Sequence, residues 1–110
     1  SQINTPAHRS TISANTFNIT GTASDTNDDP FTVKVWIKSL STSKYLTAND
    51  NGTFSSEDPV YLDVDGTDNW TVALSNVNFT EDGEEFQIFT VANDGEDGDQ
   101  YSVFVTYDVE

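Results

Sequence analysis

The sequence predicts an all-β protein folded as a sandwich of two antiparallel sheets. Apolar residues alternate with polar ones along much of the chain, and Gly, Asn, Asp or Pro interrupts every run before three helical turns could form. Turn signals recur about every 8 to 12 residues, the spacing expected of roughly seven to nine short strands joined by Greek-key connections. A chain of 110 residues supports one core and is too short for two, so we expect a single domain over residues 1–110.

Five strands are expected from the clearest runs. In FTVKVWIK (31–38), Val33, Val35 and Ile37 alternate with polar or aromatic residues, so one face of this strand is expected in the core. The remaining runs share its enrichment in β-branched and aromatic residues, which favours strands over helices. They cover residues 16–24, 70–75, 84–92 and 100–109.

The middle of the chain has weaker strand signals. The sequence NDNG at 49–52 suits a hairpin turn, because Asn and Gly tolerate positive φ angles. Strands are expected on both sides of this turn and once more before the run that starts at Trp70. Their expected bounds are 44–48, 52–57 and 59–64.

The amino-terminal segment is expected to form an edge strand that is broken at Pro6. It contains Pro6, which cannot donate a hydrogen bond to a strand ladder and therefore favours an edge position. We accordingly assign residues 1–11 to an edge strand or linker and residues 12–109 to the core module. The single histidine, His8, lies in this segment beside Arg9 and is expected to be exposed to solvent.

Net charge narrows the range of partners. The chain has 19 Asp and Glu residues against 4 Lys and Arg residues, which gives a charge of −15 at pH 7. A field of this sign repels nucleic acid and anionic membrane surfaces, so we expect neither as a partner. No run of about 18 apolar residues is present, so membrane insertion is not expected. The first residues also lack the basic-then-apolar order of a secretory signal.

The residue types also argue against catalysis. The chain has no cysteine, which removes disulfides, thiolate metal ligands and thiol nucleophiles. No serine lies in a Gly-x-Ser-x-Gly elbow. A lone sandwich of this size seldom has the deep cleft in which paired carboxylates hydrolyse glycosides. We therefore expect no enzymatic activity.

Several stretches carry a family resemblance. They are VKVWI (33–37), FNITGTASD (17–25), WTVALSNVNF (70–79) and TEDGEEFQIFTVANDGEDGD (80–99). These stretches resemble the bacterial and archaeal immunoglobulin-like modules that are repeated in tandem in large surface proteins and adhesins, with the likeness covering residues 12–109. The chain departs from such modules after TVAND, where a longer acidic segment, GEDGDQ, replaces their short turn.

The resemblance implies a fold, a setting and partners. The fold is an immunoglobulin-like sandwich, and the role is that of a non-catalytic structural or adhesion module, secreted or held at the cell surface. The isolated module is expected to be a monomer. Its expected partners are neighbouring modules of the same chain and a glycan or protein receptor on a cell surface.

The implied topology brings three acidic turns to one end of the sandwich. They are SDTNDDP, DVDGTDN and NDGEDGD, at residues 24–30, 63–69 and 93–99. The arrangement requires an odd number of strands between residues 31–38 and 70–75, and the three weaker runs satisfy this condition. The carboxylates that would then meet are those of Asp25, Asp28, Asp29, Asp63, Asp65, Asp68, Asp94, Glu96, Asp97 and Asp99.

Calcium is the cation that such a group of acids would suit. Ca²⁺ takes about six to eight oxygen ligands from carboxylates, carbonyls and water, in irregular geometry. Zinc and copper would require His or Cys, of which the chain has one and none. Two alternatives stay open. The acids belong to a spacer domain adapted to high salt, which screens their repulsion, or they are ordinary turn-forming residues.

Alternation assigns the inward residues of the later strands. Trp70 is in phase with Val72 and Leu74 and is expected to cap the core. In the last two strands the inward residues are expected to be Phe86, Ile88, Ala92, Tyr101, Val103, Val105 and Tyr107. The acids of the turn at the opposite end are expected to be solvated; they are Glu81, Asp82, Glu84 and Glu85.

The opposite phase predicts an aromatic outer face on neighbouring strands. The outward residues are Trp36, Phe89 and Phe104, with the flanking lysines Lys34 and Lys38. A row of this kind is expected to bind a carbohydrate, a peptide or a neighbouring module. Two alternatives would remove it. The hairpin at 44–57 folds over the row, or a bulge, which the polar Thr90 in the inward line suggests, reverses the strand register.

Overall fold

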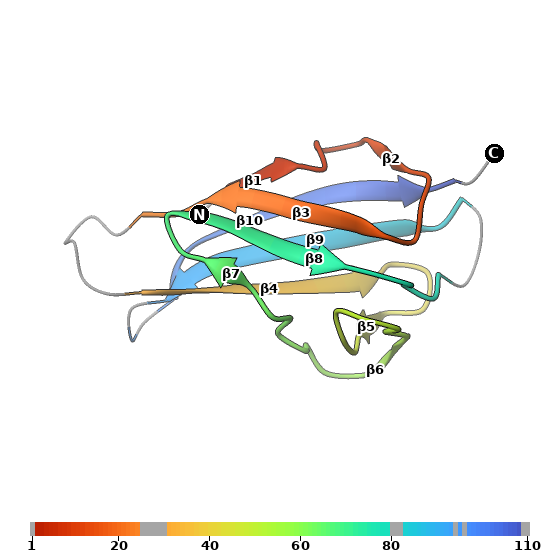
Figure 1. Ribbon diagram of the computed structural model, residues 1–110. Helices are drawn as coiled ribbons and strands as arrows, with labels where there is room; N and C mark the ends of the chain where they lie inside the picture. The colour runs from red at the N-terminus through yellow and green to blue at the C-terminus, as the bar shows by residue number, and fades with distance from the viewer. Residues whose placement is uncertain (1, 25–30, 80–82, 94, 96, 109–110) are drawn as a thin grey trace.

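The computed structural model of the protein describes residues 2–24, 31–79, 83–93, 95 and 97–108. Within these residues the chain forms ten strands in two sheets, which stack as a sandwich (Figure 1). In the same residues, no helix is long and apolar enough to cross a membrane. The all-β, two-sheet prediction is confirmed. The number of strands exceeds the roughly seven to nine expected because it includes two very short ones. β2 (Thr11–Ile12) and β7 (Asp65–Gly66) have only two residues each.

The smaller sheet has four antiparallel strands. In spatial order they are β1 (Gln2–Thr5), β3 (Phe17–Thr22), β8 (Asn69–Leu74) and β7. Trp70, Val72 and Leu74 of β8 are all buried, as their phase predicts. This sheet forms one wall of the core.

The larger sheet forms the other wall. Its spatial order is β2, β10 (Asp97–Tyr107), β9 (Glu85–Asn93), β4 (Thr32–Ser39), β5 (Lys44–Leu46) and β6 (Phe54–Ser56). β2 and β10 run parallel, and the other neighbours are antiparallel. β4 and β9 stay in register from Thr32 to Ser39, and Thr90 lies buried in the inward line. β10 has a register shift against β9 between Asp97 and Gln100, but from Gln100 to Thr106 its register is regular, so the outer face is not reversed there. The inward residues predicted correctly, buried or packed against the core, are Val33, Val35, Ile37, Phe86, Ile88, Ala92, Val103, Val105 and Tyr107.

The amino-terminal segment crosses between the sheets. β1 lies at the edge of the smaller sheet, and after Pro6 the chain joins the larger sheet as β2, so the predicted break at Pro6 is confirmed. Backbone hydrogen bonds hold the crossing segment to the last strand. They run from Arg9 N to Phe104 O (2.7 Å), from Thr106 N to Ser10 O (3.1 Å) and from Asp108 N to Ile12 O (2.9 Å).

The core is packed differently toward the two ends of the sandwich. Trp70 lies directly against Gly21, its partner across β3 and β8. A Cβ added at Gly21 would stand 2.3 Å from the Trp70 ring and 2.1 Å from the carbonyl oxygen of Gln2, so only glycine fits there. At the other end several rings share the space. Phe79 stacks on Tyr107 at 3.9 Å and lies 5.9 and 5.1 Å from Phe54 and Phe86.

Two sequence expectations about the strands are wrong. Residues 59–64 form no regular strand; Leu62 N donates one hydrogen bond to Val35 O at 2.8 Å, and the chain then crosses to the smaller sheet as β7. Three strands, β5, β6 and β7, still separate β4 from β8. Tyr101 is 36% exposed instead of buried, because β2 covers β10 only at residues 106–107 and leaves Tyr101 on the sheet edge.

Candidate functional site

The strand ends next to the three acidic turns lie together at one end of the sandwich, on the left in Figure 1. Ala23 N, just after β3, donates a hydrogen bond to Asp68 O, just before β8, at 3.0 Å. Thr32, at the start of β4, pairs with Asn93 at the end of β9. The described residues that flank the turns here are called the acidic end; they are residues 23–24, 31–32, 67–69 and 93.

Most of the ten candidate calcium ligands lie outside what the structure describes. This holds for the residues Asp25, Asp28, Asp29, Asp94 and Glu96 and for the side chains of Asp97 and Asp99. Among the described side chains, no group of three or more His, Asp or Glu residues is arranged so that it could hold a metal ion. A calcium site here stays a prediction.

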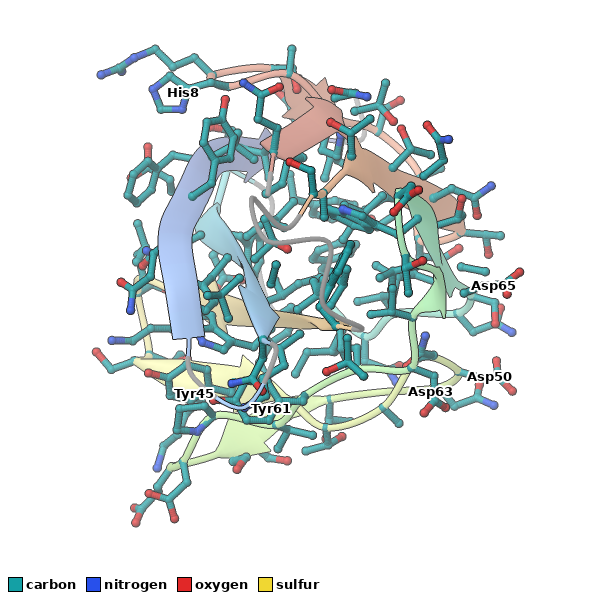
Figure 2. All side chains as sticks on the ribbon, turned by 90° about the vertical axis from the view of Figure 1, so that its left-hand side faces the viewer. His8, Tyr45, Asp50, Tyr61, Asp63 and Asp65 are labelled. Atoms are coloured by element: carbon teal, nitrogen blue, oxygen red, sulfur yellow. The ribbon has the colours of Figure 1, made fainter. Side chains whose placement is uncertain are left out.

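The three described candidates are exposed but spread along the chain. Asp68 lies in the turn itself, whereas Asp65 pairs with Thr71 along β8. Asp63 is farther from the turn, with its backbone N and O bonded to the Asn49 side chain at 2.8 and 2.9 Å. Figure 2 looks onto the acidic end and shows Asp63 and Asp65 along one side of the molecule.

One acid that the sequence assigned to solvent is buried. Glu84, just before β9, is 4% exposed, and its Oε2 accepts hydrogen bonds from the hydroxyls of Ser39 and Ser41. Ser39 is itself fully buried. The expectation that Glu84 is solvated is therefore wrong, whereas Glu85 is exposed as expected. The other acids of this turn, Glu81 and Asp82, lie outside the described residues.

The outer face of the larger sheet carries the predicted aromatic residues in a different arrangement. Trp36 and Phe89 pair across β4 and β9, and their rings stack with centroids 4.6 Å apart and planes at 10°. Phe104 does not continue this row. It pairs with Gln87, and its ring packs edge-on against the exposed His8 at 5.8 Å. The outward phase is confirmed, but the single row of three rings is wrong.

The hairpin at 44–57 extends the larger sheet and does not fold over this face. Leu46 and Phe54 are buried in the core. The Tyr45 ring instead meets Trp36 edge to face, with centroids 5.1 Å apart and planes at 88°. The hairpin therefore does not fold over the outer face as the alternative proposed, although Phe89 in this face is only 9% exposed.

Two lysines and two tyrosines complete this surface. The Nζ of Lys34 lies 5.2 Å from the centroid of the Tyr61 ring, and the Nζ of Lys38 lies 5.5 Å from that of Tyr45. Both distances are in the range of cation–π attraction. No sequence pattern pointed to Tyr61, which lies in the irregular segment 59–64; Figure 2 shows it on the same side of the molecule as Tyr45. We call this group the aromatic face: Lys34, Trp36, Lys38, Tyr45, Tyr61 and Phe89.

A third lysine makes an ordinary surface ion pair. Lys44 Nζ, at the start of β5, lies 3.0 Å from Glu57 Oε1. The hydrogen bond from Lys44, together with its charge, holds the pKa of Glu57 below its usual value. The side chains are 35% and 83% exposed, so water and salt screen this pair strongly.

Comparison of the chain with models of known protein families, with curated proteins and with solved structures gave no match. The described residues offer two surfaces of different chemistry, the acidic end and the aromatic face. Because one fold serves many functions, any functional conclusion depends on these surfaces.

Proposed function

We propose that the chain is a non-catalytic structural and adhesion module of an extracellular or cell-surface protein, with an immunoglobulin-like topology. The strand order supports this topology. With β1, β3, β8 and β7 as strands A, B, E and D, the smaller sheet has the A-B-E-D order of immunoglobulin sandwiches. With β4, β9 and β10 as C, F and G, the larger sheet contains their C-F-G order. The resemblance over residues 12–109 points to the same class of surface modules.

The observation that carries the structural role is where the chain enters and leaves the sandwich (Figure 1). Gln2 pairs with Thr22 beside the acidic end, whereas Tyr107 pairs with Ile12 toward the opposite end of the long axis. The molecule extends 44 Å along this axis and 25 and 20 Å across it. Modules of this form, linked end to end, make an extended array in which each acidic end meets a neighbouring module.

Small-angle X-ray scattering from two copies of the chain joined in tandem tests this role. We expect a maximum dimension near twice the 44 Å length of one module, because the linker leaves and enters at opposite ends. The single copy, measured under the same conditions, is the control. A compact particle with the two modules packed side by side would contradict the proposal.

Calcium is the ion that we propose at the joint. The strand ends beside the three acidic turns approach one another at Ala23 and Asp68 and at Thr32 and Asn93. Carboxylates on turns that leave from these strand ends would repel one another, and Ca²⁺ would offset the repulsion by coordinating their oxygens. A bound ion stabilises the folded state by RT ln(1 + [L]/Kd), and would stiffen the end of the module that faces its neighbour.

Thermal unfolding in about 1 mM calcium and in chelator, at one fixed ionic strength, tests the ion. At roughly ten times Kd the expected gain is about 1.4 kcal/mol, which raises Tm by about 6 °C in a domain of this size. Sodium chloride titrated alone is the control for screening. An equal rise with sodium chloride, or no rise with calcium, would exclude the ion site and favour the acidic spacer adapted to high salt.

A further inference from the structure

The outer face of the larger sheet has a charge pattern unlike the rest of this acidic chain. Three of the four basic residues, Lys34, Lys38 and Lys44, lie on β4 and β5. The register of β4, β9 and β10 places Glu85, opposite Thr106, on the same outer face, and the block of outward residues between Glu85 and the acidic end contains no carboxylate. These residues are Lys34, Trp36, Lys38, Gln87, Phe89, Val91, Gln100, Ser102 and Phe104.

The geometry of the stacked rings limits what this face can bind. The Trp36 and Phe89 centroids are 4.6 Å apart, close to the spacing of neighbouring strands, which is about 4.8 Å. The two rings therefore cover each other's faces, and Tyr45 meets Trp36 at 88°. A neutral sugar that binds by stacking needs an open ring face. Phe89 is only 9% exposed, so the pair leaves open mainly the edge of the half-buried Trp36 ring, and ring edges carry the positive side of the aromatic quadrupole.

The lysines add positive charge at a regular spacing. Lys34 and Lys38 flank Trp36 on the same side of β4 and are four residues apart, roughly 13 Å along an extended strand. The Lys34 ammonium lies over the ring of Tyr61, a residue that is 53% exposed and carries a hydroxyl. Ring edges, ammonium groups and hydroxyls together suit anionic oxygens that recur along a chain.

From this pattern we propose that the aromatic face binds an extended polysaccharide that carries carboxylate or sulfate groups, a function beyond the structural role. A peptide fits less well, because peptides commonly add as a strand to an open sheet edge. β9 lies between β4 and β10, so its backbone is already paired on both sides. Recognition here must therefore come from side chains, which suits a ligand with a regular repeat of charge.

The net charge of −15 sets the conditions under which such binding is measured. It repels a polyanion at long range, whereas the lysine contacts act within a few ångströms. The Debye length is about 8 Å at 0.15 M salt, so the long-range repulsion is screened more than the contacts are. Binding is therefore best measured at physiological ionic strength.

Isothermal titration calorimetry with dextran sulfate, and with unmodified dextran of the same length, tests the proposal. We expect binding to dextran sulfate only. The double variant Lys34→Gln, Lys38→Gln should weaken it by roughly fivefold for each lysine. The matched control is Lys44→Gln, which removes one lysine charge outside the block. It should change the affinity less than twofold.

Two further ligands complete the experiment. Polygalacturonate distinguishes carboxylate from sulfate as the recognised group, and binding to either one supports the proposal. Poly-glutamate presents the same carboxylates on a peptide. Equal affinity for dextran and dextran sulfate, tighter binding of poly-glutamate, or full affinity in the double variant with an unchanged Tm would each overturn the proposal.

Discussion

The two ends of the sandwich handle carboxylates in opposite ways. At the acidic end, Asp68 is exposed, and the flanking strands are joined by backbone contacts such as Ala23 N to Asp68 O. At the other end, Glu84 is buried and accepts hydrogen bonds from two serine hydroxyls. A hydrated carboxylate needs no protein partner, whereas a buried one is tolerated only with donors in place. A carboxylate can therefore be replaced with little loss of stability at the acidic end, whereas Glu84 at the other end is needed for stability.

The packing beneath the two ends differs as well. Under the acidic end a single large ring, Trp70, fills a slot that is closed by Gly21. At the opposite end Phe54, Phe79 and Tyr107 belong to a group of rings in mutual contact. A cluster of rings can adjust when one member changes, but a ring held against a backbone cannot. The acidic end should thus be the less tolerant of added volume.

The largest effect is expected from Gly21→Ala. The added Cβ would overlap both the Trp70 ring and the carbonyl oxygen of Gln2, so we expect a loss of about 3 kcal/mol in the free energy of unfolding, measured in urea. Asn18→Ala, on the same strand with an exposed side chain, should change it by less than about 0.5 kcal/mol. Trp70→Phe in the Gly21→Ala background should recover part of the loss. Equal stability of Gly21→Ala and the wild type would show that the slot is not tight.

A smaller effect is expected at the opposite end from Glu84→Ala. Removing the carboxylate takes away the charged acceptor that the buried Ser39 hydroxyl shares with Ser41 and leaves Ser39 only the Ser41 hydroxyl at 3.2 Å, which should cost about 2 kcal/mol. The neighbouring Glu85→Ala is the matched control, because Glu85 is exposed and its loss should be within about 0.5 kcal/mol. If both variants unfold at the same urea concentration, the two ends do not differ in how they use carboxylates.

The smallest effect is expected for the exposed pair Lys44 and Glu57, which belongs to neither end. In Lys44→Gln the pKa of Glu57 should rise toward its usual value, because its hydrogen bond and opposite charge are lost. A lowered folded-state pKa contributes stability above the unfolded-state pKa, and this is lost as the pH falls through the folded value. The Glu57 side-chain resonance, followed by NMR from neutral to acidic pH, reports the shift. An unchanged titration would mean that the pair does not persist in solution.

The alternation of side chains was sufficient to predict the two walls of the core. Val33, Val35 and Ile37 face inward because successive residues of a strand alternate between its faces. The same rule contained the signal for Glu84, which is in phase with Phe86. That signal was missed because carboxylates in an acidic turn are usually exposed to solvent.

Other features depend on contacts between distant segments, which no local pattern encodes. Residues 59–64 have strand-like composition, but they cross between the sheets and make one backbone hydrogen bond from Leu62 to Val35. Tyr101 is inward by phase, yet the partner strand stops at the 106–107 pair and leaves it exposed. Tyr61 joins the aromatic face through the Lys34 ammonium. Each of these outcomes depends on where neighbouring segments begin and end in the folded structure.

The pairing of β2 with β10 has a consequence for synthesis on the ribosome. It joins Thr11 and Ile12 to Thr106 and Tyr107, nearly the whole length of the chain apart. Contacts of such large sequence separation form late, since the intervening chain must first be ordered. During translation the residues of β2 must wait for the final strand to emerge. Limited proteolysis should therefore distinguish nascent chains arrested before and after Tyr107 has emerged from the ribosome. We expect the segment around Ser10 to be cleaved in the first and protected in the second.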